Sequence, residues 1–319
     1  MNTILIPIQF WLAITLPVMA AFAPFIVYGN DIVLKWASLA VSPLIYVISS
    51  ILILGLLSQL GRHGLIEGKF ARTNEDVTYR IRRRYTSMWT FLFYFKPLYF
   101  LVLSIPSLKF LAFRLFGYKG NLNFVVYPDT WLRDLPVLSI GQNAYLSNKA
   151  SVATNICLMD GRILVEGIGI GEKACVGHNT IVGPGTRIGD ATEIDASVTS
   201  GLRVMYGDKV KVGELCGIQH GVKIEDEAVI EAVCVIGLRC RIGPGVKISE
   251  GSHIHTGTRI RDQKEADQYF SQETGAMSRA RESVLVRLAG QLGLSDDKSK
   301  RAGIDEGQLE DKKLNRDIT

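Results

Sequence analysis

The segment IGEKACVGHNTIVGPGTRIGD, residues 170–190, decides the fold of this chain. Its residues Ile170, Val176, Val182 and Ile188 stand six positions apart, and the interval continues in both directions. The other aliphatic residues in this phase are Ile140, Leu146, Val152, Leu158, Leu164, Ile194, Val212, Ile218, Ile224, Ile230, Ile236, Ile242, Ile248, Ile254 and Ile260. A period of six matches neither the helical period of about 3.6 residues nor the alternation of one short strand.

A second rule accompanies the first. Four residues after many of these aliphatics comes a small or β-branched residue: Ala144, Ala150, Ala174, Thr180, Thr186, Thr192, Cys216, Ala228, Cys234, Cys240 and Ser252. A three-sided β-helix explains both rules, because each side is one hexad whose aliphatic points inward and whose second inward residue must be small where sides converge. Residues 140–260 hold twenty-one hexads. The sequence therefore predicts a mainly β protein with a parallel β-helix of about seven coils.

The six-residue pattern lapses at Ser200 and Tyr206. Two interpretations remain open. The lapse is either an irregular coil or a loop outside the prism, and such a loop would shift every later side assignment.

The cysteines follow the same spacing. Cys157 and Cys175 are eighteen residues apart, which is one coil, so we expect them to stack about 4.8 Å from each other. That spacing permits a disulfide, but a reduced, packed pair fits a cytosolic protein better. Cys216, Cys234 and Cys240 hold the small inward position and are expected to fill the core.

The N-terminal part of the chain is apolar. The chain has 319 residues, 47% of them hydrophobic, and a net charge of +5 that is unevenly distributed. Residues 4–28 and 37–60 are uncharged and long enough to span a bilayer as helices. We therefore predict a transmembrane helical hairpin over residues 1–60, without a signal peptide because no basic segment precedes the apolar one.

Residues 61–87 form a basic linker. Its cations are Arg62, Lys69, Arg72, Arg80, Arg82, Arg83 and Arg84. Such a cluster directly after a span favours the cytoplasmic side, and it also attracts anionic lipid. The prediction is an inner (cytoplasmic) membrane protein whose β-helix faces the cytoplasm.

Residues 88–116 are rich in aromatic side chains, but Lys96-Pro97, Pro106, Lys109 and Arg114 interrupt them. An interior Lys-Pro is rare in a spanning helix, whereas aromatics mixed with cations suit the headgroup layer. We predict an interfacial or re-entrant pair of helices. The alternative is a third span, which would place the β-helix on the opposite side of the membrane.

The rest of the chain, from residue 117 onward, contains two predicted regions. Residues 117–262 are the connector and the β-helix, and residues 263–319 are a helix followed by a charged tail. We expect the helix, over residues 263–294, to cover the open end of the prism, where unpaired strand edges need protection.

Segment 170–190 closely resembles the repeat signature of the hexapeptide-repeat acyltransferase superfamily. The resemblance implies a left-handed β-helix, a homotrimer, and an acyl-CoA bound in a groove between two subunits with a histidine as general base. The order of membrane helices ahead of repeats also resembles the membrane-bound terminal region of nonribosomal-peptide-synthetase-like proteins. The repeats cover about 120 of the 319 residues.

The expected chemistry requires a base, hydrogen-bond donors for the thioester oxygen and cations for the CoA phosphates. His178 and His220, each two residues after an aliphatic, are the candidate bases, and a continuous phase puts them on different sides of the prism. Asn155 stands where sugar acetyltransferases often carry a histidine, and we expect it to orient the acceptor. The candidate phosphate partners are Arg187, Arg203, Lys209, Arg239 and Arg241.

The sequence favours a membrane-anchored acyltransferase that moves an acetyl or other short acyl group from acyl-CoA to a hydroxyl or amine. A membrane-associated acceptor is expected because tethering raises its local concentration. Expected partners are two further copies of the chain, membrane lipid and the acceptor. The alternative is a non-catalytic trimeric β-helix scaffold at the membrane. The sequence contains no metal-ligand cluster, nucleotide-binding loop or nucleic-acid footprint.

Overall fold

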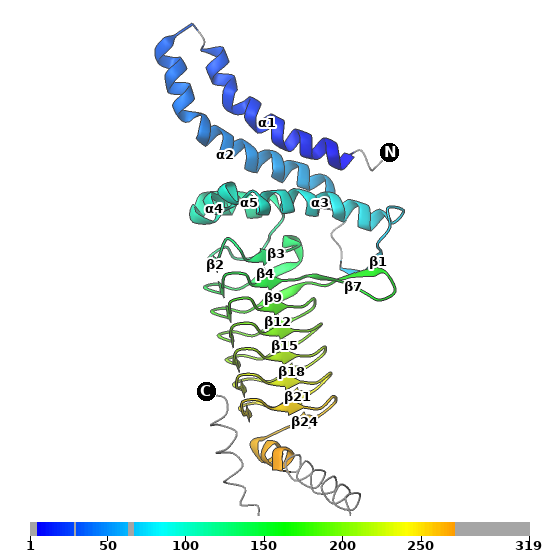
Figure 1. Ribbon diagram of the computed structural model, residues 1–319. Coiled ribbons are helices and arrows are strands. Elements are labelled where there is room, and N and C mark those ends of the chain that lie inside the picture. Colours follow the sequence, from blue (N-terminus) through cyan, green and yellow to red (C-terminus); the bar gives the residue numbers. More distant parts are fainter. Residues whose placement is uncertain (1–4, 29, 63–66, 272–319) are drawn as a thin grey trace, which may run out of the picture. The chain divides into compact units, whose positions relative to one another are not determined.

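The chain folds into a three-sided parallel β-helix preceded by helices α1–α5 (Figure 1). The computed structural model describes residues 5–28, 30–62 and 67–271. Each face of the prism is a parallel sheet of seven strands. The predicted β-helix is therefore confirmed, with seven strands on each face.

The strands visit the three faces in turn. The first face contains β2 (Val125–Val126), β5 (Tyr145–Leu146), β10 (Cys175–Val176), β13 (Glu193–Ile194), β16 (Lys211–Val212), β19 (Val229–Ile230) and β22 (Lys247–Ile248). The second contains β3 (Trp131–Leu132), β6 (Ser151–Val152), β11 (Ile181–Val182), β14 (Thr199–Ser200), β17 (Gly217–Ile218), β20 (Val235–Ile236) and β23 (His253–Ile254). The third contains β4 (Leu138–Ile140), β9 (Ile168–Ile170), β12 (Arg187–Ile188), β15 (Met205–Tyr206), β18 (Lys223–Ile224), β21 (Arg241–Ile242) and β24 (Arg259–Ile260).

Strands of two residues explain the six-residue rule. In β12, Arg187 points outward and is exposed, whereas Ile188 points inward and is buried. The turn after each strand places one residue in the left-handed region. Gly185 and Gly221 take it at φ values of 76° and 69°, where a glycine avoids the clash of a Cβ. Val233 holds the same place at a φ of 60°, so the turn is imposed by the stack rather than by local preference.

A hairpin leaves the prism between β6 and β9. Tyr145 pairs with Cys175, thirty residues later, whereas Cys175 pairs with Glu193 at the regular interval of eighteen. The extra residues form β7 (Asn155–Cys157) and β8 (Arg162–Val165), which join β1 (Gly68–Ala71) in a three-stranded antiparallel sheet.

This insertion corrects two predictions. Leu158 and Leu164 do not belong to sides of the prism, because they are part of the hairpin. The hairpin adds two hexads, so the six-residue interval continues through it and the sequence pattern does not reveal it. Cys157 does not stack on Cys175 for the same reason. It pairs with Ile163 in the hairpin, and both cysteines are free thiols. Cys157 is exposed, whereas Cys216, Cys234 and Cys240 are buried as predicted.

The lapse at Ser200 and Tyr206 is an ordinary coil. β14 and β15 keep their register with the coils above and below. The two hydroxyl groups lie 2.5 Å apart inside the prism, so each satisfies the other. Burial raises the pKa of Tyr206. A small and a large side chain together replace two aliphatics.

Helices α1 (Leu5–Val27) and α2 (Ile32–Arg62) form an antiparallel pair (Figure 1). Both are long and apolar enough to cross a membrane. Their outer surfaces carry large exposed apolar side chains, among them Trp11, Ile26 and Leu56. The far end of α2 packs on the helices that follow, because Gly55 and Gly61 have no side chain to hold them off: a Cβ at Gly61 would come within 2.6 Å of the Ile81 carbonyl oxygen.

Helices α3 (Val77–Tyr94), α4 (Lys96–Ser104) and α5 (Pro106–Leu115) join α2 to the first coil. Trp89 lies at the centre of this junction, with ring centroids 5.1 Å from Phe116 and 5.8 Å from Phe113. Its indole N–H donates to the Leu132 carbonyl oxygen at 2.6 Å, which ties α3 to β3. A cluster of buried aromatics with satisfied polar tips makes a firm joint.

The α4–α5 pair bends by 113° at Ile105. Lys96 donates to the Pro128 carbonyl oxygen at 2.9 Å, and Lys109 donates to the carbonyl oxygens of Leu122 and Phe124. Both lysines therefore bind the connector that leads into the first coil.

The second unit begins at Lys264, after Gln263 ends the first. Residues 263–271 are helical, which agrees with the start of the predicted C-terminal helix. The rest of that helix and the charged tail lie outside the described residues.

Candidate functional site

The three edges of the prism sort the predicted site residues. We call the edge between the first and second faces the first edge, that between the second and third faces the second edge, and that between the third and first faces the third edge. His178 follows β10 and lies on the first edge, whereas His220 follows β17 and lies on the second. The prediction that the two histidines lie on different sides is therefore confirmed.

His178 is exposed on the first edge. Its backbone carbonyl accepts a hydrogen bond from the Ser197 N–H at 2.8 Å. Among the described residues, its imidazole has no hydrogen-bond partner. Both ring nitrogens are therefore open to an external ligand.

His220 has a structural role. Its Nδ1 accepts the N–H of Leu202, one coil earlier, at 2.9 Å. Asp208 and Asp226 do the same on the third edge, where each carboxylate accepts the N–H of the residue eighteen positions before it, at 2.8 and 2.9 Å. With Nδ1 engaged as an acceptor, the neutral ring carries its proton on Nε2 and has no lone pair left to act as a base.

The five predicted cations fall into two groups. Arg203 makes an ion pair with Glu166, and Lys209 makes one with Glu227 at 3.0 Å. The other three are exposed, and their side chains have no ion pair or hydrogen bond with the described residues: Arg187, Arg239 and Arg241. Arg239 is on the second edge, and Arg187 and Arg241 point outward from the third face.

A hollow of about 550 Å³ lies beside Arg187, the one member of this group that lines it. Its lining includes two arginines, two carboxylates and two glycines: Arg187, Arg203, Glu67, Glu166, Gly167 and Gly185. Because Glu166 neutralises Arg203, Arg187 is the cation in the hollow that remains unpaired. The two glycines leave backbone uncovered there.

Asn155 lies elsewhere. It begins β7 and lines a second pocket, of about 300 Å³, together with Arg72, Arg82, Arg83 and Arg133. The sequence predicts the first three arginines as part of a basic cluster, but it does not indicate that Arg133 joins them. Adjacent charged residues in the connector, Arg133 and Asp134, were the available signal. Among the residues that the structure describes, no cluster of three or more His, Cys, Asp or Glu is placed to hold a metal ion.

No protein-family model matches the sequence, and no curated protein matches it with statistical significance. Similar solved structures include the UDP-N-acetylglucosamine acyltransferase of Francisella novicida, at 16% identity over 43% of this chain and 62% of that chain, with a TM-score of 0.24. The UDP-N-acetylglucosamine O-acyltransferase of Moraxella catarrhalis is 12% identical over 45% and 65%, with a TM-score of 0.27. A perosamine N-acetyltransferase of Caulobacter crescentus, in complex with CoA and GDP-perosamine, is 17% identical over 44% and 56%, with a TM-score of 0.21. Each match spans less than two thirds of the other chain.

Proposed function

We propose that the protein is a membrane-anchored acyltransferase. It takes an acetyl or other short acyl group from acyl-CoA, with acetyl-CoA as the first candidate, and transfers it to a hydroxyl or amine of a membrane-associated acceptor. The observation that carries the proposal is the set of three unpaired arginines on the second edge and third face, Arg187, Arg239 and Arg241. An ester phosphate and a pyrophosphate, such as CoA contains, are ligands that free guanidinium groups bind well.

The anchor is α1 with α2. Ile26 is 76% exposed and Trp11 64% exposed, and helices with surfaces this apolar are stable in lipid rather than in water. The α4–α5 pair is re-entrant in this proposal. Lys96 in α4 and Lys109 in α5 both bind the connector, so the pair enters and leaves on the side of the β-helix, and neither cation has to cross the hydrocarbon. The basic segment after the anchor supports a β-helix on the cytoplasmic side of the inner membrane, which is part of this proposal.

The acceptor base is His178. A base must offer a free lone pair to the acceptor proton, and the His178 ring is open whereas that of His220 is engaged. In one chain His178 lies on a different edge from the unpaired arginines. The proposal therefore requires a homotrimer in which the first edge of one copy packs against a neighbouring copy, so that His178 and the arginines come from two chains.

The first edge and second face support that assembly. Leu215 is 60% and Val233 49% exposed, at equivalent places one coil apart, and Val235 is exposed two residues after Val233. A row of exposed aliphatics on a regular β-helix is typical of a surface that another subunit covers.

The test of the donor is calorimetry of the full chain in detergent with acetyl-CoA and succinyl-CoA. We expect Arg187→Ala/Arg241→Ala to weaken binding about tenfold, because two charge-assisted contacts are lost. The matched control is Lys211→Ala/Lys247→Ala, which removes the same charge from exposed positions of the first face, and it is expected to change binding less than about twofold.

The test of the base is turnover. We expect His178→Ala to bind acyl-CoA but to lose about a hundredfold or more of its rate of CoA release, while His220→Ala keeps most of it. The reverse result would transfer the base to His220. A folded trimer that binds neither acyl-CoA would exclude the enzyme and leave the non-catalytic scaffold.

A further inference from the structure

We propose that the arginine pocket, which we define by Arg72, Arg82, Arg83 and Arg133, binds the phosphate group of a phosphate ester at the membrane surface. Four guanidinium groups from two distant parts of the chain line one pocket of about 300 Å³. Within the described part of the chain, Asp134 is the carboxylate that makes an ion pair with one of these arginines, Arg82, at 2.5 Å. One negative charge against four positive ones leaves the pocket with an excess of three.

The two inner arginines are incompletely satisfied. Arg82 is only 3% exposed, and its Nε has no hydrogen-bond partner among the described residues. The Nε of Arg133 is buried and unpartnered as well. Buried donors without partners cost free energy, and an anion with several oxygen acceptors would remove that cost at both positions.

The burial of Arg133 also favours the binding of an anion. Desolvation lowers the pKa of its guanidinium, and the neighbouring Asp134 carboxylate opposes that shift. A cation that has lost its water gains more from an incoming anion than an exposed one does. The outer pair, Arg72 and Arg83, are exposed at the mouth and complete a fork around the entering group.

A buried network holds the pocket in shape. The Asp134 Oδ2 accepts hydrogen bonds from Arg82 and, at 2.7 Å, from the Thr154 hydroxyl. Thr154 directly precedes Asn155, whose side chain makes no hydrogen bond with the described residues. Asn155 can therefore contact a substituent on the bound phosphate.

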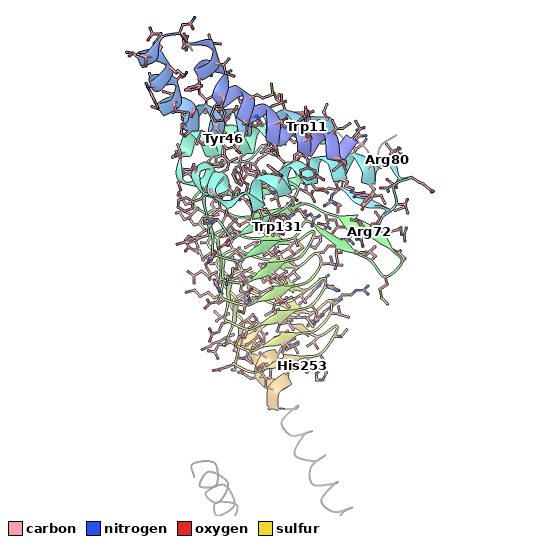
Figure 2. The ribbon with its side chains drawn as sticks, turned by 45° about the horizontal axis from the view of Figure 1, so that its top comes forward. Trp11, Tyr46, Arg72, Arg80, Trp131 and His253 are labelled. Atoms are coloured by element: carbon pink, nitrogen blue, oxygen red, sulfur yellow. The ribbon has the colours of Figure 1, made fainter. Side chains whose placement is uncertain are left out.

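The position of the pocket points to the membrane surface. Gly61, the last residue of the second candidate span, packs against Ile81 and Tyr85, which flank Arg82 on α3. Arg82, on the inner wall of the pocket, therefore lies on the part of α3 that packs against the end of that span. Figure 2 shows Arg72 beside the small antiparallel sheet and Arg80 on α3. Lipid phosphates lie at this level of a bilayer, and soluble phosphate esters are the other source of the same chemistry.

The first experiment measures retention of labelled phosphatidic acid by the immobilised full chain in nonionic detergent micelles. We expect Arg72→Ala/Arg83→Ala to lower retention about tenfold, because two direct charge-assisted contacts are lost. The matched control is Lys69→Ala/Arg80→Ala, which removes the same charge from the same segment outside the pocket; at physiological salt it is expected to cost less than about twofold. Equal losses in the two double variants would overturn the pocket.

Two competitors separate the sources. Oleate carries a similar charge without a phosphate, and if it competes as well as unlabelled phosphatidic acid, phosphate recognition is wrong. Inorganic phosphate or glycerol phosphate that competes as well as the lipid assigns the pocket to a soluble phosphate. Competition by phosphatidic acid alone assigns it to a lipid. These binding results are independent of acyl transfer, so they stand or fall separately from the proposed function.

The second experiment uses the native chain without substitutions. Cys157 is an exposed free thiol that lines the pocket, with its Sγ 3.9 Å from the Arg72 guanidinium. We expect phosphatidic acid to slow alkylation of Cys157 several-fold and oleate to leave it unchanged, with Cys157→Ser confirming the labelled site. Alkylation at the same rate with and without phosphatidic acid would place the lipid elsewhere.

Discussion

The regular coils and the junction at residues 67–167 use polar side chains in different ways. In the coils, Asp208 and Asp226 cap turns on an exposed edge, and the same contact recurs every eighteen residues. In the junction, Arg82, Asp134 and Thr154 form a buried network that occurs once. A repeated exposed contact is replaceable by water, whereas a unique buried one is not. The stack is therefore held by many contacts that water can replace, whereas the junction depends on a buried network that water cannot replace.

The largest expected effect comes from breaking the buried network. Asp134→Ala leaves the Arg82 charge buried without its partner, which is expected to lower the free energy of unfolding by about 3–5 kcal/mol. Denaturant unfolding of the full chain in detergent measures it, with Asp208→Ala as the exposed control. Equal losses of unfolding free energy in the two variants would mean that the buried network of the junction stabilises the chain no more than an exposed cap of the coils does. Replacing both partners, as Arg82→Met/Asp134→Leu, is expected to recover most of the loss.

A smaller effect is expected inside the prism. Tyr206→Phe removes one of two hydroxyls that satisfy each other, so the Ser200 hydroxyl is left buried without a partner, at a cost of about 1–3 kcal/mol. Tyr206→Phe/Ser200→Ala removes both groups and is expected to be more stable than the single variant. The same denaturant titration checks both. A double variant that is less stable than Tyr206→Phe would show that the hydroxyl pair is not an isolated unit.

The smallest effect is expected at His220. Its bond to the Leu202 N–H lies on the surface, so water replaces it in His220→Ala, and the stability changes by about 0.5 kcal/mol or less. His220→Asp, which imitates the caps of the third edge, is expected to match the wild type. A loss above about 2 kcal/mol in His220→Ala would contradict the cap as a replaceable contact.

The sequence predicted the coils well because each coil obeys the same rule. Ile188, Ile194 and the equivalent residues are buried at the expected interval. The hairpin escaped notice because its length preserves the phase. The second rule contained the missing signal: four residues after Leu158 stands Arg162, a long charged side chain that cannot occupy the small inward position. The failure of the small-residue rule at Arg162 was therefore more informative than the unbroken six-residue interval of aliphatic residues.

The candidate site was less predictable. His178 and His220 hold the same hexad position, so the six-residue pattern alone does not say which of them is the base. The two rings differ in their hydrogen bonds. The His220 ring accepts a hydrogen bond from the Leu202 N–H, one coil earlier, whereas the His178 ring has no such donor beside it among the described residues. Ion pairing also distinguishes Arg187 from Arg203. Glu166, directly after the hairpin strand β8, makes an ion pair with Arg203 and none with Arg187.

The sequence by itself determined the three-sided stack and the two apolar helices, because these follow from local periodicity and from side-chain polarity. Only the tertiary structure decided that residues 155–165 leave the prism, and that Arg72, Arg82, Arg83 and Arg133 share one pocket. The reason is physical: a period reports which face a residue takes within its own element, whereas a pocket forms where elements distant in sequence meet, and their contacts are set by packing across the whole chain.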